Sequence, residues 1–345
     1  MLTDGSYPPL RLGPEEIASI VRAKQPPPIT AAAALMVDLD ANQTLYERYP
    51  RVPLPPASTV KVMTAFLALE YADLDDPVTV SPMAAGTPGS RMGLMPGEVV
   101  TVQDLLYGLL LASGNDAAVA VAEHVGGSLA SFVALMNETA HSLGMADSHF
   151  TNPHGLDDPA QVASAADLVT LTRAALAFPA FAHIVATEEA YVAGRSLVNT
   201  NHLLTIYPGA DGVKTGTTQA AGECLIASVT RAGHRLLVVL LGSQDRYGDA
   251  IALLDYAAQG WRWGKVDLPT DALAWEADAD GHRYRLRVEQ PFDIFLPAWQ
   301  WPLIQPVRSL DSSIPLTGTL PVGSLHLMLA GQVVATAPLT TWLEP

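Results

Sequence analysis

The sequence predicts an α+β protein, a sheet with a helical insertion followed by a small β-rich domain. Apolar, β-branched strand patterns occur early, at 33–40, and return between 212 and 241. Between them, residues 90–178 mostly show the apolar spacing of amphipathic helices. Strands, a helical block and strands again, in that order, indicate a sheet that is interrupted by helices.

The N-terminal part begins with a proline-rich stretch that contains a short helical candidate at 14–24. The buried strand at 33–40 turns into a second strand at 44–48, which predicts a hairpin. Further prolines then stop regular structure, and 58–71 has the spacing of a helix. Ser58 is therefore expected at a helix N-terminus, close to the positive end of the helix dipole.

In the middle of the chain, helices and strands are again predicted from the spacing of apolar residues. Apolar spacing predicts helices at 102–111, 116–124, 129–143, 164–177 (opened by a capping box) and 249–263. The first two are separated by a break at Ala112-Ser113-Gly114-Asn115. Apolar, β-branched runs predict strands at 212–215, 223–231 and 235–241, with a hairpin turn at 232–233.

From residue 265 the pattern changes. Prolines recur, 283–288 alternates polar and apolar side chains with period two, and 323–329 has the composition of another strand. The predicted domains are therefore 1–264, which holds all the candidate functional residues, and 265–345, a small β-rich domain.

Composition excludes several classes of function. The net charge is −16 and the pI about 4.8, which disfavours nucleic acid and anionic membranes as partners. A single cysteine, Cys224, allows neither an intrachain disulfide nor a cysteine zinc cluster, and the nine histidines form no metal motif. We therefore expect no metal and no cofactor. No segment has the apolar length of a transmembrane span, and the first residues lack the pattern of an intact signal peptide.

Lysine is scarce in this chain, which holds four lysines against 15 arginines. Arginine keeps its proton in proteins, whereas a buried lysine can lose its proton and act as a base. Two of the four, Lys61 and Lys214, lie in short motifs that suggest chemistry.

The first motif is Ser58-Thr59-Val60-Lys61. Side chains three residues apart lie on one face of a helix, so Lys61 can reach the Ser58 hydroxyl and remove its proton if burial lowers the lysine pKa. Taken alone, the motif is better explained by a capping serine followed by an exposed lysine.

The second motif, Ser113-Gly114-Asn115, lies at the break between two helices. Its hydroxyl could relay a proton and its amide could hold a substrate carbonyl, although serine, glycine and asparagine are also common helix caps.

The third motif is Lys214-Thr215-Gly216, followed by Thr217. On a strand, Lys214 would supply positive charge and Thr215 a hydroxyl for a substrate carboxylate, while Gly216 allows a ligand close to the backbone. When this motif stands alone, a strand end followed by a turn explains it better.

Together, in the order S-x-x-K, S-x-N and K-T-G, the motifs resemble those of the penicillin-interacting serine enzymes. Over about 28–264 the chain is similar to the low-molecular-weight penicillin-binding proteins, the D-alanyl-D-alanine carboxypeptidases of the bacterial cell wall. The similarity rests on PASTVKVMTA at 56–65, LLASGNDAA at 110–118, TNPHGLD at 151–157 and GVKTGTT at 212–218.

The resemblance implies a β-lactamase/transpeptidase-like domain, an antiparallel sheet flanked by helices, and a second domain of β-sandwich type. It also implies that the nucleophile is Ser58, that Lys61 is its base and that Ser113 relays a proton to the leaving D-alanine. Asn115 would hold the substrate amide, and the N–H groups of Ser58 and Thr217 would form an oxyanion hole. Positive potential and carboxylate binding would come from Lys214, Thr215 and Arg246, with Gly216 beside them.

The implied substrate is a peptidoglycan stem peptide ending in D-Ala-D-Ala, and β-lactams would acylate the same serine. These partners imply a place in the periplasm or cell envelope and a role in peptidoglycan biosynthesis and cell shape. Some relatives carry histidine at the position of Thr217, which leaves the rate of acyl-enzyme hydrolysis open. Many relatives end in a basic amphipathic anchor helix, which this chain does not show, so membrane attachment is not predicted.

Three other functions compete with the carboxypeptidase. A β-lactamase of the same fold is disfavoured because no E-x-x-L-N stretch lies between the second and third motifs. A non-catalytic penicillin sensor is disfavoured because a pure binding protein does not need Lys61. An endopeptidase that cuts peptidoglycan cross-links stays open. His154, beside Gly155, is expected to be structural.

Overall fold

The computed structural model describes residues 25–231, 233–265, 273, 275–277, 283–288, 292–311, 313–314, 316 and 321–343. The predicted helix at 14–24 and residue 232 of the predicted hairpin turn lie outside these residues. One compact unit comprises Pro27–Asp255, and the other includes Tyr256–Pro345. This division falls earlier than the boundary at 264/265 that the sequence predicts. The assignment of 1–264 and 265–345 as two functional domains stays a prediction.

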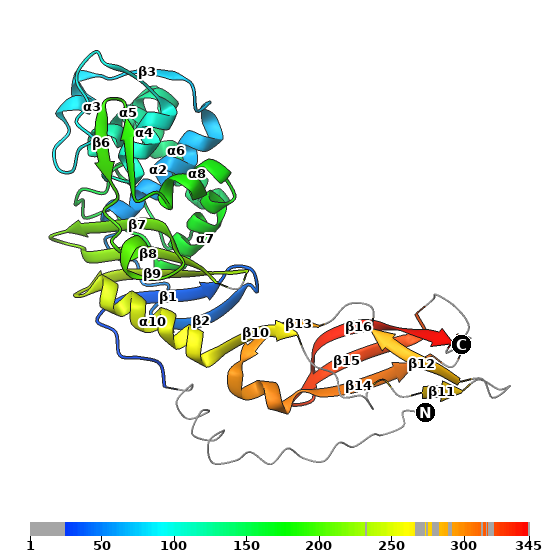
Figure 1. The fold of residues 1–345 in the computed structure, drawn as a ribbon. Helices are drawn as coiled ribbons and strands as arrows, with labels where there is room; N and C mark the ends of the chain where they lie inside the picture. Colours follow the sequence, from blue (N-terminus) through cyan, green and yellow to red (C-terminus); the bar gives the residue numbers. More distant parts are fainter. Residues whose placement is uncertain are drawn as a thin grey trace. The chain divides into compact units, whose positions relative to one another are not determined.

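A five-stranded antiparallel sheet forms the base of the first unit, in the order β2-β1-β9-β8-β7 (Figure 1). The N-terminal hairpin supplies two strands and the late segment supplies three, as the sequence predicts. Their bounds are β1 Ala33–Asp38, β2 Gln43–Arg48, β7 Ala210–Thr218, β8 Gly222–Arg231 and β9 His234–Ser243.

The helical insertion lies between β2 and β7, and Figure 1 shows most of it gathered on one side of the sheet. Two short hairpins accompany it, β3 Pro77–Thr79 with β4 Val99–Thr101 and β5 Glu189–Val192 with β6 Arg195–Val198. The helices are α2 Lys61–Tyr71, α3 Pro82–Gly86, α4 Val102–Leu110, α5 Asn115–Gly126, α6 Leu129–Ser142, α7 Ala165–Leu176, α8 Pro179–Val185 and α9 Leu203–Ile206.

Helix α2 lies at the centre of this block. It contacts α4, α5 and α7, and seven of its residues are buried, from Lys61 to Ala68. A helix that is apolar on nearly every side belongs in a core rather than at a surface. The same packing buries Lys61, the first residue of α2, and so creates the environment that a lysine base needs.

The predicted helix ends are partly confirmed. The Ser164 hydroxyl accepts the Asp167 N–H at 3.1 Å and so caps α7, but the Asp167 carboxylate turns away to bind the Ser148 hydroxyl at 2.7 Å. The capping box that is complete in the structure joins Thr101 and Asp104 at the start of α4.

Three predicted elements need correction. Ser58 does not open an α-helix, because Ala57–Val60 forms a 3₁₀ turn (η1) and α2 begins at Lys61. The third motif is not a strand end, since β7 continues to Thr218. The predicted helix at 249–263 is α10, Arg246–Gly260, and Trp261–Lys265 forms strand β10 instead. There, Trp261 and Trp263 alternate along a strand and both stack on Phe295.

The second unit is β-rich, as the sequence predicts. Strand β10 pairs with β13, Asp293–Pro297, which leads into a 3₁₀ segment, η2, at Ala298–Leu303. A five-stranded sheet has the order β11-β12-β16-β15-β14. Its strands are β11 Trp275–Ala277, β12 Arg283–Val288, β14 Gln305–Leu310, β15 Gly323–Leu329 and β16 Gln332–Leu343. Leu286, Leu325, Leu327 and Leu339 are the centre of its core.

Within the described part of the chain, no single helix has the length and apolar character needed to cross a membrane. Two bent helix pairs, α5 with α6 and α7 with α8, meet that criterion only when each pair is taken together.

Candidate active site

The Ser58 side chain lies on the one-turn helix η1, immediately before α2. The preceding residue, Ala57, has φ 49°, a left-handed conformation that is costly for a residue with a side chain. Gly155 packs directly against this turn: a Cβ on Gly155 (φ +90°) would lie 2.1 Å from the Ala57 carbonyl oxygen, so only glycine fits there. The serine is thus held on a tight, packed turn rather than on a regular helix.

Lys61 has three polar partners around its Nζ atom. These are Ser58 Oγ at 2.8 Å, Asn115 Oδ1 at 2.7 Å and the His154 carbonyl oxygen at 2.7 Å. The amide and carbonyl oxygens can only accept, so they take two N–H groups of the lysine. In the neutral amine the third position is the lone pair, and it faces the one partner that can donate, the Ser58 hydroxyl. The geometry therefore suits proton transfer from Ser58 to Lys61.

The electrostatics of Lys61 favour the neutral amine. Its side chain is fully buried, and burial lowers its pKa well below the usual value near 10.5, helped by the nearby charge of Lys214. Asp116 acts in the opposite direction, as the smallest of the three influences. A lysine in this setting can act as a base near neutral pH.

The second motif forms a buried corner between α4 and α5. Ser113 has φ 58°, and the Gly114 N–H donates to the Gly108 carbonyl at 2.9 Å, which closes the turn. Asn115, the first residue of α5, donates from Nδ2 to the Pro88 carbonyl at 2.7 Å while its Oδ1 accepts from Lys61. The amide therefore orients the base, a contact that its sequence motif does not reveal.

The third motif lies on β7, which packs against η1. A Cβ on Gly216 would lie 2.8 Å from the Ser58 nitrogen and 2.9 Å from Ala57 Cβ, so only glycine fits here without displacement. Lys214 is buried and donates to the Thr215 carbonyl at 3.0 Å. Burial and the charge of Arg246 lower the pKa of Lys214 to about 7.

Arg246, the first residue of α10, contacts strand β7 through its side chain. Its Nη1 donates to the Gly216 carbonyl at 2.9 Å and the Cys224 carbonyl at 3.2 Å, and its Nη2 contacts the Thr217 hydroxyl. Glu223 forms an ion pair with the same Nη2 at 3.2 Å. The predicted carboxylate-binding arginine therefore lies beside the third motif, but with its terminal N–H groups already engaged.

These groups surround a cavity of about 310 Å³, within the range of small-ligand sites. Six of the nine predicted residues line this cavity, and the other three lie behind it. Lys61 contacts both Ser58 and Asn115, and Lys214 is buried in β7. The cavity is lined by Ser58, Ser90, Ser113, Thr200, His202, Thr215, Gly216, Thr217, Glu223, Arg246 and Tyr247.

Sequence reasoning missed several of these residues. The Thr200 and Thr215 hydroxyls lie 2.8 Å apart, and the Tyr247 hydroxyl donates to the Thr200 carbonyl at 3.0 Å. Neither Thr200 nor Tyr247 belongs to a motif with a fixed spacing. His154 gives its backbone carbonyl to Lys61, while burial and the Lys61 charge lower the pKa of its own side chain to about 4.

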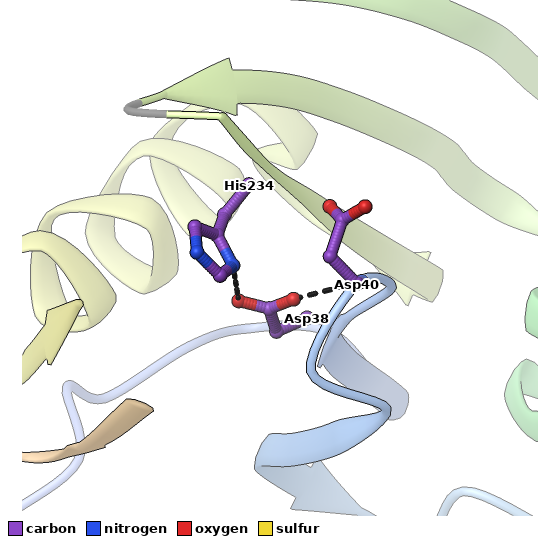
Figure 2. Close-up of side chains that lie close together, drawn as sticks. All are labelled: Asp38, Asp40 and His234. Atoms are coloured by element: carbon purple, nitrogen blue, oxygen red, sulfur yellow. Dashed lines mark hydrogen bonds and ion pairs between the residues drawn. The ribbon is translucent and has the colours of Figure 1, made fainter. Parts of the chain in front are cut away.

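A separate cluster lies at the far end of the sheet, where Asp38, Asp40 and His234 place their ligand-type atoms within 4.8 Å of one another (Figure 2). The sequence analysis did not find it, because the residues come from distant strands. Asp38 Oδ1 accepts the Asp40 and Ala41 N–H groups, and Oδ2 pairs with His234 Nδ1 at 3.2 Å. Asp40 accepts the Arg235 N–H at 2.6 Å. These contacts join the β1–β2 turn to β9 and give the cluster a structural role.

Comparisons with known proteins agree on one family. A family model described as D-alanyl-D-alanine carboxypeptidase matches residues 20–245. The chain is 37% identical over 240 residues to D-alanyl-D-alanine carboxypeptidase DacF of Bacillus subtilis, covering 66% of this chain and 62% of that protein. It is 33% identical to DacD of Salmonella typhimurium, covering 96% of this chain and 91% of the relative.

Solved structures extend the similarity to both units. Penicillin binding protein 6B from Escherichia coli superposes with a TM-score of 0.74 at 32% identity, covering 92% of this chain and 96% of that one. D-alanyl-D-alanine carboxypeptidase DacD from Francisella tularensis gives a TM-score of 0.70 at 25% identity, covering 92% and 94%.

Fold and site together define a serine-type penicillin-binding enzyme with a transpeptidase-like fold. The chain belongs to the D-alanyl-D-alanine carboxypeptidase family, whose members are extracytoplasmic enzymes. It is a low-molecular-weight, serine-type carboxypeptidase, as its motifs predict.

Proposed function

We propose that this enzyme removes the terminal D-alanine from peptidoglycan stem pentapeptides through an acyl-enzyme on Ser58, and that β-lactams acylate the same serine. One observation carries the proposal. The buried Lys61 amine has two acceptor-only partners, and its remaining position faces the Ser58 hydroxyl at 2.8 Å. A serine-directed base in a cavity of this size suits acyl transfer to a small peptide end.

In the acylation step, Ser58 Oγ attacks the carbonyl carbon between the two D-alanines and its proton passes to Lys61 Nζ. The carbonyl oxygen gains the negative charge and accepts from the N–H groups of Ser58 and Thr217. Because Gly216 lets β7 approach the Ser58 nitrogen closely, the two donors lie on neighbouring backbones. Losing one such donor typically costs about 2.7–4 kcal/mol of transition-state stabilisation.

The tetrahedral intermediate then collapses, and the C–N bond to the terminal D-alanine breaks. Ser113, which lines the same cavity, relays a proton to the leaving amine. Free D-alanine departs, and Ser58 keeps the remaining peptide as an ester. Water then attacks the ester carbon, Lys61 accepts a proton from that water, and Lys61 returns a proton to Ser58 Oγ as the ester bond breaks. The shortened peptide leaves with a new terminal carboxylate, and Ser58 and Lys61 are back in their original states.

Recognition of the substrate uses the opposite wall of the cavity. The Thr215 and Thr217 hydroxyls and the charge of Arg246 face the terminal carboxylate, and Lys214 adds positive potential from within β7. Asn115 lies behind the cavity, held between Lys61 and Pro88. The proposal keeps for it the role that its motif implies, which is to hold the substrate amide. On this proposal, residues 1–264 form the catalytic domain, and 265–345 form a β-sandwich-like domain.

The test measures D-alanine released from a peptide ending in D-Ala-D-Ala. Wild type should release one D-alanine per peptide, Ser58→Ala should release none, and Ser196→Ala should match wild type because Ser196 is exposed on β6. Cleavage of a cross-linked peptide at a higher kcat/KM than the linear peptide would instead identify an endopeptidase. Release by Ser58→Ala would remove Ser58 from the mechanism.

A further inference from the structure

Glu223 is an acidic residue inside the cavity that is expected to bind an anion. It lies on β8, paired with Thr217 of β7, and it lines the cavity together with Ser58 and Thr215. Its side chain is 38% exposed, so it belongs to the rim of the cavity and not to the core. A negative charge at this place opposes the terminal carboxylate of the proposed substrate.

Both carboxylate oxygens of Glu223 are directed to Arg246. Oε2 accepts the Arg246 backbone N–H at 3.0 Å, and Oε1 pairs with Nη2 at 3.2 Å. The hydrogen bond from the Arg246 side chain lowers the pKa of Glu223 below its usual value, so the carboxylate is ionised at neutral pH. Glu223 is therefore an anion that is already bound at the arginine.

The guanidinium of Arg246 has four N–H groups on its two terminal nitrogens. Two of them meet the backbone carbonyls of Gly216 and Cys224, and the other two meet the Thr217 hydroxyl and Glu223. The carbonyls are fixed by β7 and β8. Glu223 is the one charged partner of the four, and it can leave by rotating its side chain into solvent.

We propose that Glu223 is an internal competitor that weakens binding of the substrate's terminal carboxylate, because both carboxylates take the same Arg246 donor. An incoming carboxylate replaces Glu223 on Nη2, so one carboxylate–arginine contact is exchanged for another. The inference rests on the proposed function, because it assumes that the terminal carboxylate binds at this wall.

The test compares wild type with Glu223→Gln, which keeps the shape of the side chain and removes its charge. Two ligands are used, a D-Ala-D-Ala peptide with a free carboxylate and the same peptide as its C-terminal amide. KM is measured for the acid, and the amide is measured as a competitive inhibitor. Glu47→Gln, on the exposed face of β2, is the control for the change in net charge.

We expect the KM of the acid to fall roughly two- to fivefold in Glu223→Gln, the size typical of a partly exposed ion pair, with kcat unchanged. The inhibition constant of the amide should not change, and the difference should shrink at high salt because exposed charges are screened. Glu47→Gln should leave both values unchanged.

An unchanged or higher KM for the acid, or an equal shift for acid and amide, would overturn the proposal, because Glu223 would then only support the wall. A change in kcat alone would overturn it too. The proposed function fails separately: neither wild type nor Glu223→Gln would then release D-alanine from the peptide with the free carboxylate.

Discussion

Replacing Gly216 with alanine tests how closely β7 must approach the nucleophile. The added Cβ would lie 2.8 Å from the Ser58 nitrogen, 2.9 Å from Ala57 Cβ and 3.2 Å from the Thr59 nitrogen. Ordinary contacts for such atoms are about 3.5–4 Å, so β7 and η1 must separate by about 0.7 Å or more. All three neighbours belong to the packed turn of Ser58 rather than to a flexible side chain, so the separation displaces the nucleophile from the proposed oxyanion donors.

A misplacement of about 1 Å at a reacting centre can cost about 100-fold in rate. We therefore expect Gly216→Ala to slow acylation by penicillin roughly 10- to 100-fold, measured as the rate of adduct formation by mass spectrometry. Gly86→Ala is the matched control, because a Cβ on Gly86 would meet nothing within 4 Å. An acylation rate within twofold of wild type, in a Gly216→Ala protein that melts normally, would refute this account of the glycine.

Three further predictions concern the charged groups of the site. Lys61→Arg keeps a long basic side chain, but arginine does not lose its proton and cannot supply a base. Acylation should therefore fall by about 10²–10⁴, and a near-normal rate would exclude Lys61 as the base. The acylation rate should rise with pH as Lys61 loses its proton, at a pKa well below 10.5. KM for a carboxylate peptide, but not for its amide, should rise above pH about 7 as Lys214 loses its proton. Asp116→Ala should lower the free energy of unfolding by about 3 kcal/mol in denaturant titrations, because it leaves the buried N–H groups of Met92 and Leu94 and the partly buried N–H group of Gly93 without their acceptor; a loss under about 1 kcal/mol would contradict this.

The three motifs could be predicted from sequence because each has a fixed local spacing on a regular element. Ser58 and Lys61 are neighbours on consecutive turns whichever helix type holds them, so the 3₁₀ turn of η1 changes the element but not the pairing. The order of strands and helices likewise followed from apolar periodicity. The end of α10 did not, because tryptophans at 261 and 263 fit a helix or a strand until their partner, Phe295, is known.

The contacts that tune the motifs could not be predicted, because they depend on packing between distant segments. The His154 carbonyl reaches Lys61 only because Gly155 passes under the Ser58 turn. Glu223 reaches Arg246 because β8 places it opposite Thr217. Neither residue has a sequence signature of its own, and the roles of both are set by the register of the sheet and the path of a loop.

The covalent adduct on Ser58 tests the central claim most directly. The protein is incubated with a penicillin, and its intact mass is measured for wild type, Ser58→Ala and Ser196→Ala. The account predicts one penicillin added to wild type and to Ser196→Ala, none to Ser58→Ala, and an adduct that outlasts the seconds expected of a β-lactamase. An adduct on Ser58→Ala, or none on the wild type, would contradict the assignment of Ser58 as the nucleophile that Lys61 activates.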